Sequence, residues 1–124
     1  MVRVAVNGLG FNIEAAGEGF PLLLLHGFTG SAETWQPSAA AWGGFRTMAV
    51  DLIGHGATEA PAGEARYTME RCAADLVALL DTLEVDRVAL LGYSMGGRAA
   101  LQLALTAPGR IAALVLESAS PGIE

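Results

Sequence analysis

The sequence predicts an α/β protein built around a mainly parallel β-sheet. Segments typical of strands alternate with segments typical of helices along the 124 residues, and such alternation requires right-handed crossovers between parallel strands. The segment at 21–25 is a continuous apolar run, as expected for a strand buried on both faces. Because 52% of the residues are hydrophobic and 16% are charged, we expect residues 1–124 to form one domain with one core.

Local signals place each element in order. Strands are predicted at 3–6, 11–15, 21–25, 45–52, 87–91 and 111–116. The first two strands form a hairpin around Asn7-Gly8. Residues 31–42 are weakly helical, with Ser31 as a candidate N-cap and an interruption at Pro37. Thr68 caps a second helix, and a third helix covers 95–107. The second helix has an apolar face made of Cys72, Leu76, Leu79 and Leu83.

Composition excludes several classes of partner. Thirteen acidic and seven basic residues give a net charge of −6, which argues against nucleic acid and anionic membranes. The apolar runs are too short to span a bilayer, and the first residues lack the apolar stretch of a signal peptide. We therefore expect a soluble cytoplasmic protein. The single cysteine, Cys72, permits neither an internal disulfide nor a cysteine metal cluster, and we expect a buried thiol, no metal and no cofactor.

The run Gly92-Tyr93-Ser94-Met95-Gly96 is the principal chemical motif. It lies between a predicted strand and a predicted helix, as a nucleophile elbow requires. The sharp turn leaves no room for side chains at the flanking positions, which are occupied by Gly92 and Gly96. Ser94 is therefore the candidate nucleophile, at a helix N-terminus that favours negative charge. The alternative is a glycine-rich helix entry with a solvated serine.

A second motif follows the strand at 21–25 and runs from His26 to Ser31. Acyl chemistry needs two N–H donors directed at the developing oxyanion. In elbow enzymes one donor belongs to the residue after the nucleophile, here Met95, and the other to the loop after this earlier strand. Phe28 is the candidate for the second donor. The alternative is an ordinary turn between strand and helix.

The two histidines, His26 and His55, both precede Ser94. His55 lies in a tight glycine turn, and His26 lies at a strand end under the candidate oxyanion loop, so we interpret both as structural. Glu117 ends the last predicted strand, and we favour a structural role for it as well. Because no histidine follows Ser94, the sequence lacks the base that would activate a serine near neutral pH.

Four segments together resemble the α/β-hydrolase superfamily in order and spacing. They are residues 25–31 with Trp35, 51–56, 92–98 and 114–122. Within that superfamily, the segments look like the SHCHC (2-succinyl-6-hydroxy-2,4-cyclohexadiene-1-carboxylate) synthase family of menaquinone biosynthesis, whose lyases eliminate pyruvate. The resemblance covers residues 11–123. It implies that Ser94 belongs to a proton-abstracting triad, that Arg98 binds a substrate carboxylate and that Tyr93 lines the pocket. The spacing of Ser94 and Arg98 places both on one helix face.

The resemblance also implies that these residues form the N-terminal half of an α/β-hydrolase-type fold. Six strands with flanking helices are present, and the chain is truncated before the last two strands, most of the cap, and the triad acid and histidine. We therefore expect weak or no activity from the chain alone. An apolar edge at 111–116 predicts a homo-oligomer, formed by pairing of terminal strands or by exchange of elements.

Three functions remain open from the sequence. The first is the N-terminal half of an SHCHC synthase-type lyase that acts on a small anionic carboxylate. The second is half of a serine esterase or carbon–carbon-bond hydrolase, which would need neither Arg98 nor the ending at 114–122. The third is a non-catalytic half-fold that self-assembles and binds ligands without turnover.

Overall fold

The computed structural model describes residues 2–27, 30–35, 43–52, 58 and 68–117. These residues contain a six-stranded sheet with the order β1-β2-β4-β3-β5-β6. The strands are β1 (Val2–Val6), β2 (Leu9–Ala16), β3 (Phe20–Leu25), β4 (Phe45–Val50), β5 (Val88–Tyr93) and β6 (Ile111–Glu117). Strand β2 is antiparallel to β1 and β4, whereas β4, β3, β5 and β6 are mutually parallel. The predicted mainly parallel α/β sheet is therefore confirmed.

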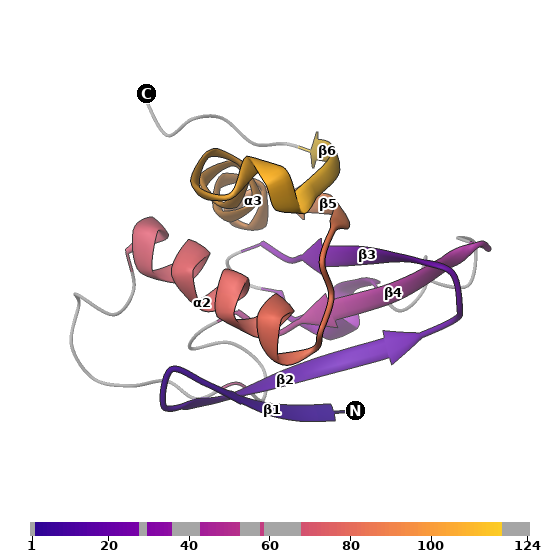
Figure 1. Ribbon diagram of the computed structural model, residues 1–124, viewed down its shortest axis with the longest axis horizontal. Coiled ribbons are helices and arrows are strands. Elements are labelled where there is room, and N and C mark those ends of the chain that lie inside the picture. Colours follow the sequence, from indigo (N-terminus) through magenta and orange to yellow (C-terminus); the bar gives the residue numbers. More distant parts are fainter. Residues whose placement is uncertain (1, 28–29, 36–42, 53–57, 59–67, 118–124) are drawn as a thin grey trace.

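Helices cover the sheet on both faces. Helices α2 (Met69–Thr82) and α3 (Met95–Thr106) pack against each other on one face, α2 towards β1 and α3 towards β5 and β6 (Figure 1). The short 3-10 helix η1 (Ala32–Trp35) packs on the opposite face, and η3 (Pro108–Arg110) joins α3 to β6. The first strand, β1, and the last strand, β6, form the two opposite edges of the sheet.

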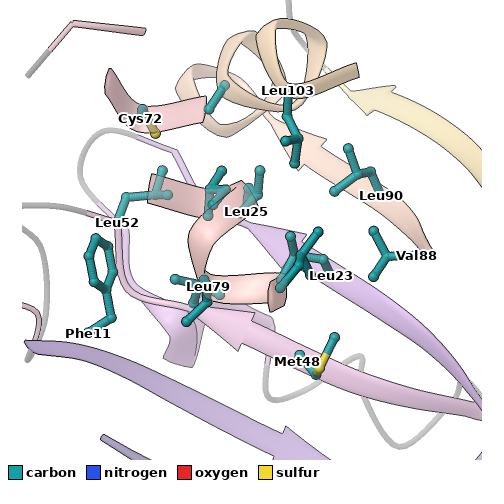
Figure 2. Packing of buried hydrophobic residues seen from close by; sticks show 14 of the residues in the cluster. Phe11, Leu23, Leu25, Met48, Leu52, Cys72, Leu79, Val88, Leu90 and Leu103 are labelled. Carbon is teal, nitrogen blue, oxygen red and sulfur yellow. The ribbon is translucent and has the colours of Figure 1, made fainter. Parts of the chain in front are cut away.

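Strand β3 shows why its sequence is a continuous apolar run. Leu23 and Leu25 point into the larger core, where Figure 2 shows them beside Leu79 and Leu103 of the two helices. Leu22 and Leu24 point to the other face and pack with Trp35. Burial of a strand on both faces leaves no position for a polar side chain, so the prediction for 21–25 is confirmed.

Sequence signals for the hairpin and for α2 are also confirmed. Asn7 and Gly8 both have positive φ angles, of 49° and 81°, as the favoured two-residue hairpin turn requires. The amide of Asn7 donates a 2.9 Å hydrogen bond to Asp75 and so fastens the turn to α2. Thr68 caps α2 by accepting a hydrogen bond from the backbone of Arg71. Cys72 is buried in the larger core.

Most element boundaries differ from the prediction by one or two residues, among them both ends of β2 and of β5. Strand β4 ends at Val50. Asp51 N–H still bonds to Asn12 O of β2, but the Asp51 carbonyl accepts from the Thr58 hydroxyl and Leu52 N–H donates to the His26 ring, so the strand ladder does not continue. The weakly helical segment at 31–42 contains the 3-10 helix η1, directly after Ser31. Pro37 lies outside the described residues, so the expected interruption there stays a prediction.

Strand β6 forms one edge of the sheet. It pairs with β5, and no strand among the described residues pairs with its other side. Its side chains are poorly covered: Val115 is 56% exposed and Leu116 is 40% exposed. This apolar edge strand is the feature that predicted self-association.

The described ranges of the chain contain neither a candidate membrane span nor a candidate metal site. None of the helices there combines the length and the apolar character needed to cross a membrane. No group of three or more His, Cys, Asp or Glu residues in those ranges could hold a metal ion.

Helix α2 ends in a Schellman motif with an unusual residue at its centre. Val85 N–H bonds to Leu80 O at 2.9 Å, and Glu84 N–H bonds to Asp81 O at 3.1 Å. Leu80 and Val85 are both buried in the core, which supplies the hydrophobic contact of this motif. Glu84 has a φ angle of 59°, in a region where glycine is the usual residue.

We expect Glu84→Gly to raise the free energy of unfolding by about 1 kcal/mol. The left-handed conformation costs an L-residue about 1–2 kcal/mol, part of which is offset by the greater freedom of glycine in the unfolded chain. Urea unfolding followed by circular dichroism measures the change. Glu84→Ala is the matched control, because it removes the charge but keeps the Cβ atom. An equal gain in both variants would show that charge, not backbone conformation, is the source.

Candidate active site

Ser94 occupies a strained turn between β5 and α3. Its φ and ψ angles are 54° and −114°, a conformation that costs a non-glycine residue about 1–3 kcal/mol. Three backbone hydrogen bonds hold it. Ser94 N–H donates to Glu117 O of β6 at 2.9 Å, and Ser94 O accepts from Gly97 and Arg98 N–H at 2.9 and 3.2 Å. Ser94 is partly exposed, so its hydroxyl is presented at the end of the sheet.

The two glycines of the motif permit this turn. A Cβ atom on Gly92 would overlap the carbonyl of Gly96 and the Cα of Gly97. A Cβ atom on Gly96 would overlap the carbonyl groups of Leu25 and His26 at the end of β3. The clashes involve backbone, which cannot move aside as a flexible side chain can. The sequence-based reason for glycine at both positions agrees with these contacts.

The first part of the candidate oxyanion loop lies against Ser94. A Cβ atom on Gly27 would be 3.5 Å from Ser94 Cβ and 3.2 Å from Cδ2 of Tyr93. Gly30 N–H bonds to Gly27 O at 3.0 Å. Phe28 itself lies outside the described residues, so its role as an oxyanion donor stays a prediction.

The second candidate donor is positioned by α3. Met95 is the first residue of this helix, and N–H groups in a first helical turn have no acceptor within the helix. Its position directly after Ser94 is compatible with the proposed donor role, because the helix N-terminus also carries partial positive charge.

His26 is fully buried and its two ring nitrogens contact backbone groups. Leu52 N–H donates to Nε2 at 2.9 Å, so Nε2 carries no proton. Nδ1 then carries the proton and donates it to Gly27 O, at 2.6 Å. With these partners the ring joins the ends of β3 and β4, and its accepting nitrogen is occupied by Leu52. These contacts support the structural interpretation of His26. His55 lies outside the described residues.

Three further predicted residues surround Ser94. Arg98 is exposed on the first turn of α3. Tyr93 is 41% exposed and its ring packs beside Gly27. Glu117 is exposed, and its backbone carbonyl accepts the hydrogen bond from Ser94 N–H. Tyr93, Ser94 and Arg98 thus lie within six consecutive residues, at the end of β5 and the start of α3.

Asp51 is a site residue to which sequence analysis assigned no role. Its side chain is buried, with Oδ1 accepting from Ala32 N–H at 2.6 Å and Oδ2 accepting from the Asn12 amide at 2.8 Å. Ala32 directly follows the loop that contains Phe28. One signal in the sequence could have identified this residue. Asp51 directly follows a buried strand, and a charged side chain buried there needs hydrogen-bond partners of its own.

Comparison with known proteins places these features in a family. A model of the alpha/beta hydrolase fold family matches residues 21–124. A protein of Bacillus subtilis, provisionally named 2-succinyl-6-hydroxy-2,4-cyclohexadiene-1-carboxylate synthase, is 42% identical over 99% of this chain and 43% of its own length. The 2-hydroxy-6-oxo-2,4-heptadienoate hydrolase of Pseudomonas putida is 36% identical over 94% of this chain and 43% of that protein.

Solved structures give the same result. A hydrolase from Pseudomonas aeruginosa superimposes with a TM-score of 0.93 and 34% identity, over 99% of this chain and 47% of that one. An epoxide hydrolase from Vigna radiata gives a TM-score of 0.89 and 37% identity, over 93% and 38% of the two chains. The chain therefore spans less than half the length of the relatives it matches.

We expect Ser94→Gly to be more stable than Ser94→Ala by about 1 kcal/mol. Glycine adopts the observed backbone conformation without strain, whereas alanine keeps the Cβ atom and therefore the strain. Both variants lack the hydroxyl, so the difference between their free energies of unfolding reports the backbone strain at residue 94. Denaturant unfolding of the two variants measures it. Equal stability would mean that the surrounding contacts, not the Cβ atom of residue 94, determine the energy of the turn.

Proposed function

The chain belongs to the α/β-hydrolase fold family, and from this premise we propose that it carries the serine-bearing part of an enzyme active site. The observation that carries the proposal is the position of Ser94, strained at the elbow and adjacent to Gly27 at the start of the loop after β3. Met95 and Phe28 are the proposed oxyanion donors. Strain at a site that the surrounding structure holds in place is typical of functional residues.

We propose more specifically a lyase of the SHCHC synthase type. In such a reaction a base removes a proton from a ring carbon, the C–H electron pair forms a C=C bond of the ring, and the bond between the ring and the enol oxygen breaks. The leaving group departs as the enolate of pyruvate, which takes up a proton to give pyruvate. The 42% identity with the Bacillus subtilis relative supports this choice. So does Arg98, because a guanidinium binds a carboxylate through two parallel hydrogen bonds. A local cation of this kind can attract an anionic substrate despite the net charge of −6.

The base for Ser94 is proposed to come from outside these 124 residues. No histidine follows Ser94 in the sequence, and His26 uses its accepting nitrogen for Leu52. Serine without a base is a poor nucleophile near neutral pH. We therefore expect the 124-residue chain alone to hydrolyse a p-nitrophenyl ester close to the rate of Ser94→Ala. Robust serine-dependent turnover would instead place a base within the chain or in a second copy.

The second candidate is part of a serine esterase or a carbon–carbon-bond hydrolase. It is favoured by the similarity to the Pseudomonas putida hydrolase, and it requires the same elbow and the same loop. The difference between the two candidates is the carboxylate-binding role of Arg98. A third candidate, a non-catalytic self-assembling unit, is favoured by the exposed apolar strand β6.

Substitution of Arg98 separates the lyase from the esterase. The test uses a chimera in which this chain replaces the matching part of the Bacillus subtilis relative, so that the remaining residues of a full-length relative are present. We expect Arg98→Ala to raise the KM for the carboxylate substrate of the elimination by about tenfold to a hundredfold, since a charged hydrogen bond contributes about 1.5–3 kcal/mol. Hydrolysis of a neutral p-nitrophenyl ester should be nearly unchanged. Steady-state kinetics with both substrates measures the two effects.

Arg87→Ala is the charge-matched control for Arg98→Ala. Arg87 is exposed and directly precedes β5, at the opposite end of that strand from Ser94. Its loss changes the net charge equally without touching the site. An Arg98→Ala chimera with unaltered kinetics towards the carboxylate substrate would contradict the lyase proposal. Activity that survives Ser94→Ala would contradict both enzyme proposals.

The 124-residue chain is proposed to self-associate through β6. We expect light scattering at micromolar concentration to give at least twice the mass of one chain. Val115→Lys should shift the protein towards monomer, because a charge on an edge strand opposes strand pairing. Leu105→Lys is the control, since Leu105 is an equally apolar and 71% exposed residue on α3, away from the edge. A well-behaved monomer at these concentrations would contradict the proposal.

A further inference from the structure

Two consecutive residues after β4 contact the two ends of the loop that is proposed to contain an oxyanion donor. Leu52 N–H bonds to the ring of His26, where the loop begins. The carboxylate of Asp51 bonds to Ala32 N–H, where the loop has just ended. The Gly27–Gly30 turn lies between these two attachment points. The conformation of the loop is therefore set from strand β4 as well as from β3, from which the loop emerges.

Asp51 itself is held in place on every side. Its backbone N–H donates to Asn12 O at 3.0 Å and its backbone carbonyl accepts from the Thr58 hydroxyl at 2.6 Å. Thr58 in turn accepts from Asn12 N–H at 2.9 Å. Asp51, Asn12 and Thr58 are all buried. The carboxylate therefore has little freedom to move, and the position of Ala32 follows from it.

The chemistry of this position requires a carboxylate. Ala32 N–H and the Asn12 amide nitrogen are both donors, so both side-chain oxygens of Asp51 must accept. An asparagine would place an NH₂ group against one of these donors. Asn12 could turn its amide to compensate, but its nitrogen would then lose the 3.0 Å bond to Glu14. Burial of a charged group is unfavourable. Asparagine has the same shape as aspartate without the charge, so an aspartate at this position indicates that two acceptor oxygens are needed.

We propose that Asp51 is a positioning residue for the proposed oxyanion loop. Its carboxylate fixes Ala32 and thereby the point at which the loop ends, while His26 and Gly27 fix the point at which it begins beside Ser94. The inference rests on the proposed function for its catalytic consequence. Its structural part, control of loop geometry by the carboxylate, is independent of any activity and can be tested separately.

Amide hydrogen exchange in the 124-residue chain tests the structural part. Gly30 N–H is the reporter, because it bonds to Gly27 within the loop and not to Asp51. In Asp51→Asn we expect Gly30 to exchange about tenfold to a hundredfold faster, the loss that corresponds to one charged hydrogen bond. Val85 N–H, which closes the end of α2, should change little and serves as the reference. Unchanged exchange at Gly30 would overturn the proposal.

Two further variants separate positioning from general destabilisation. Thr58→Val removes two hydrogen bonds that hold the backbone of Asp51 and Asn12 but leaves the carboxylate bonded to Ala32, so Gly30 should exchange much more slowly than it does in Asp51→Asn. Ala32→Pro removes only the donor, at the first position of η1, where proline is tolerated. It should accelerate Gly30 as Asp51→Asn does, and it replaces that variant if Asp51→Asn does not fold. Equal acceleration in Thr58→Val would show that the loop responds to any loss of stability, which overturns the proposal.

Ester cleavage with added imidazole tests the catalytic part in the same chain. Imidazole supplies an external base, and the rate found with Ser94→Ala is subtracted. We expect Asp51→Asn to lower the rate at saturating ester at least tenfold, with the half-saturating concentration within twofold, because an oxyanion donor acts on the transition state. A rate equal to that of Thr58→Val would overturn the positioning role. No serine-dependent cleavage in the parent chain would contradict the proposed function, and the exchange data would then decide the role of Asp51 alone.

Discussion

The close approach of helix α3 to the end of strand β3 is the constraint on which the rest of the site depends. Gly96 lies so near the carbonyl groups of Leu25 and His26 that no side chain fits between them. The chain must therefore leave β5 and enter α3 without an intervening loop. That sharp turn leaves Ser94 in its strained conformation, and it also brings Gly27 against the serine.

The strained conformation of Ser94 is held in place from both strands that neighbour β5, namely β3 and β6. On one side, the packing of Gly96 fixes the start of α3 against β3. On the other side, Ser94 N–H is bonded to the last residue of β6, Glu117. A conformation that costs about 1–3 kcal/mol persists only where its surroundings determine it. Strand β6 is therefore more than an edge, because its final carbonyl group holds the elbow in place.

Much of this architecture could be predicted because the relevant signals are local. Asn7-Gly8 specifies a hairpin turn by conformation, Thr68 marks a helix start, and the apolar run at 21–25 requires burial on both faces. The elbow was predictable for the same reason, since its glycines and Ser94 lie within five consecutive residues. Each of these features leaves its signal within a short stretch of sequence, although the contacts that require Gly96 are made with Leu25 and His26.

The features that escaped prediction depend on contacts between distant residues. Asp51 meets an amide 39 positions away in Asn12, and His26 meets a backbone group 26 positions away in Leu52. Neither pairing has a sequence pattern, because both arise only once β4 lies between β2 and β3. Glu84 escaped for a different reason. Glutamate gives no signal for a left-handed residue, and its position is set by the burial of Leu80 and Val85 on either side.

The sheet order assigns a separate task to each of three neighbouring strands. Strand β3 lies between β4 and β5, so the loop that follows β3 is flanked by Asp51 on one side and by Ser94 on the other. Asp51 follows β4 and Ser94 follows β5, so the residue proposed to orient the loop and the residue that carries the hydroxyl come from different strands. A change at Asp51 can therefore alter the proposed donor without altering the strained turn at Ser94. The position of the Ser94 hydroxyl and the geometry of the proposed oxyanion donors can therefore change independently. Both are built on the buried central strand β3, which lies between β4 and β5.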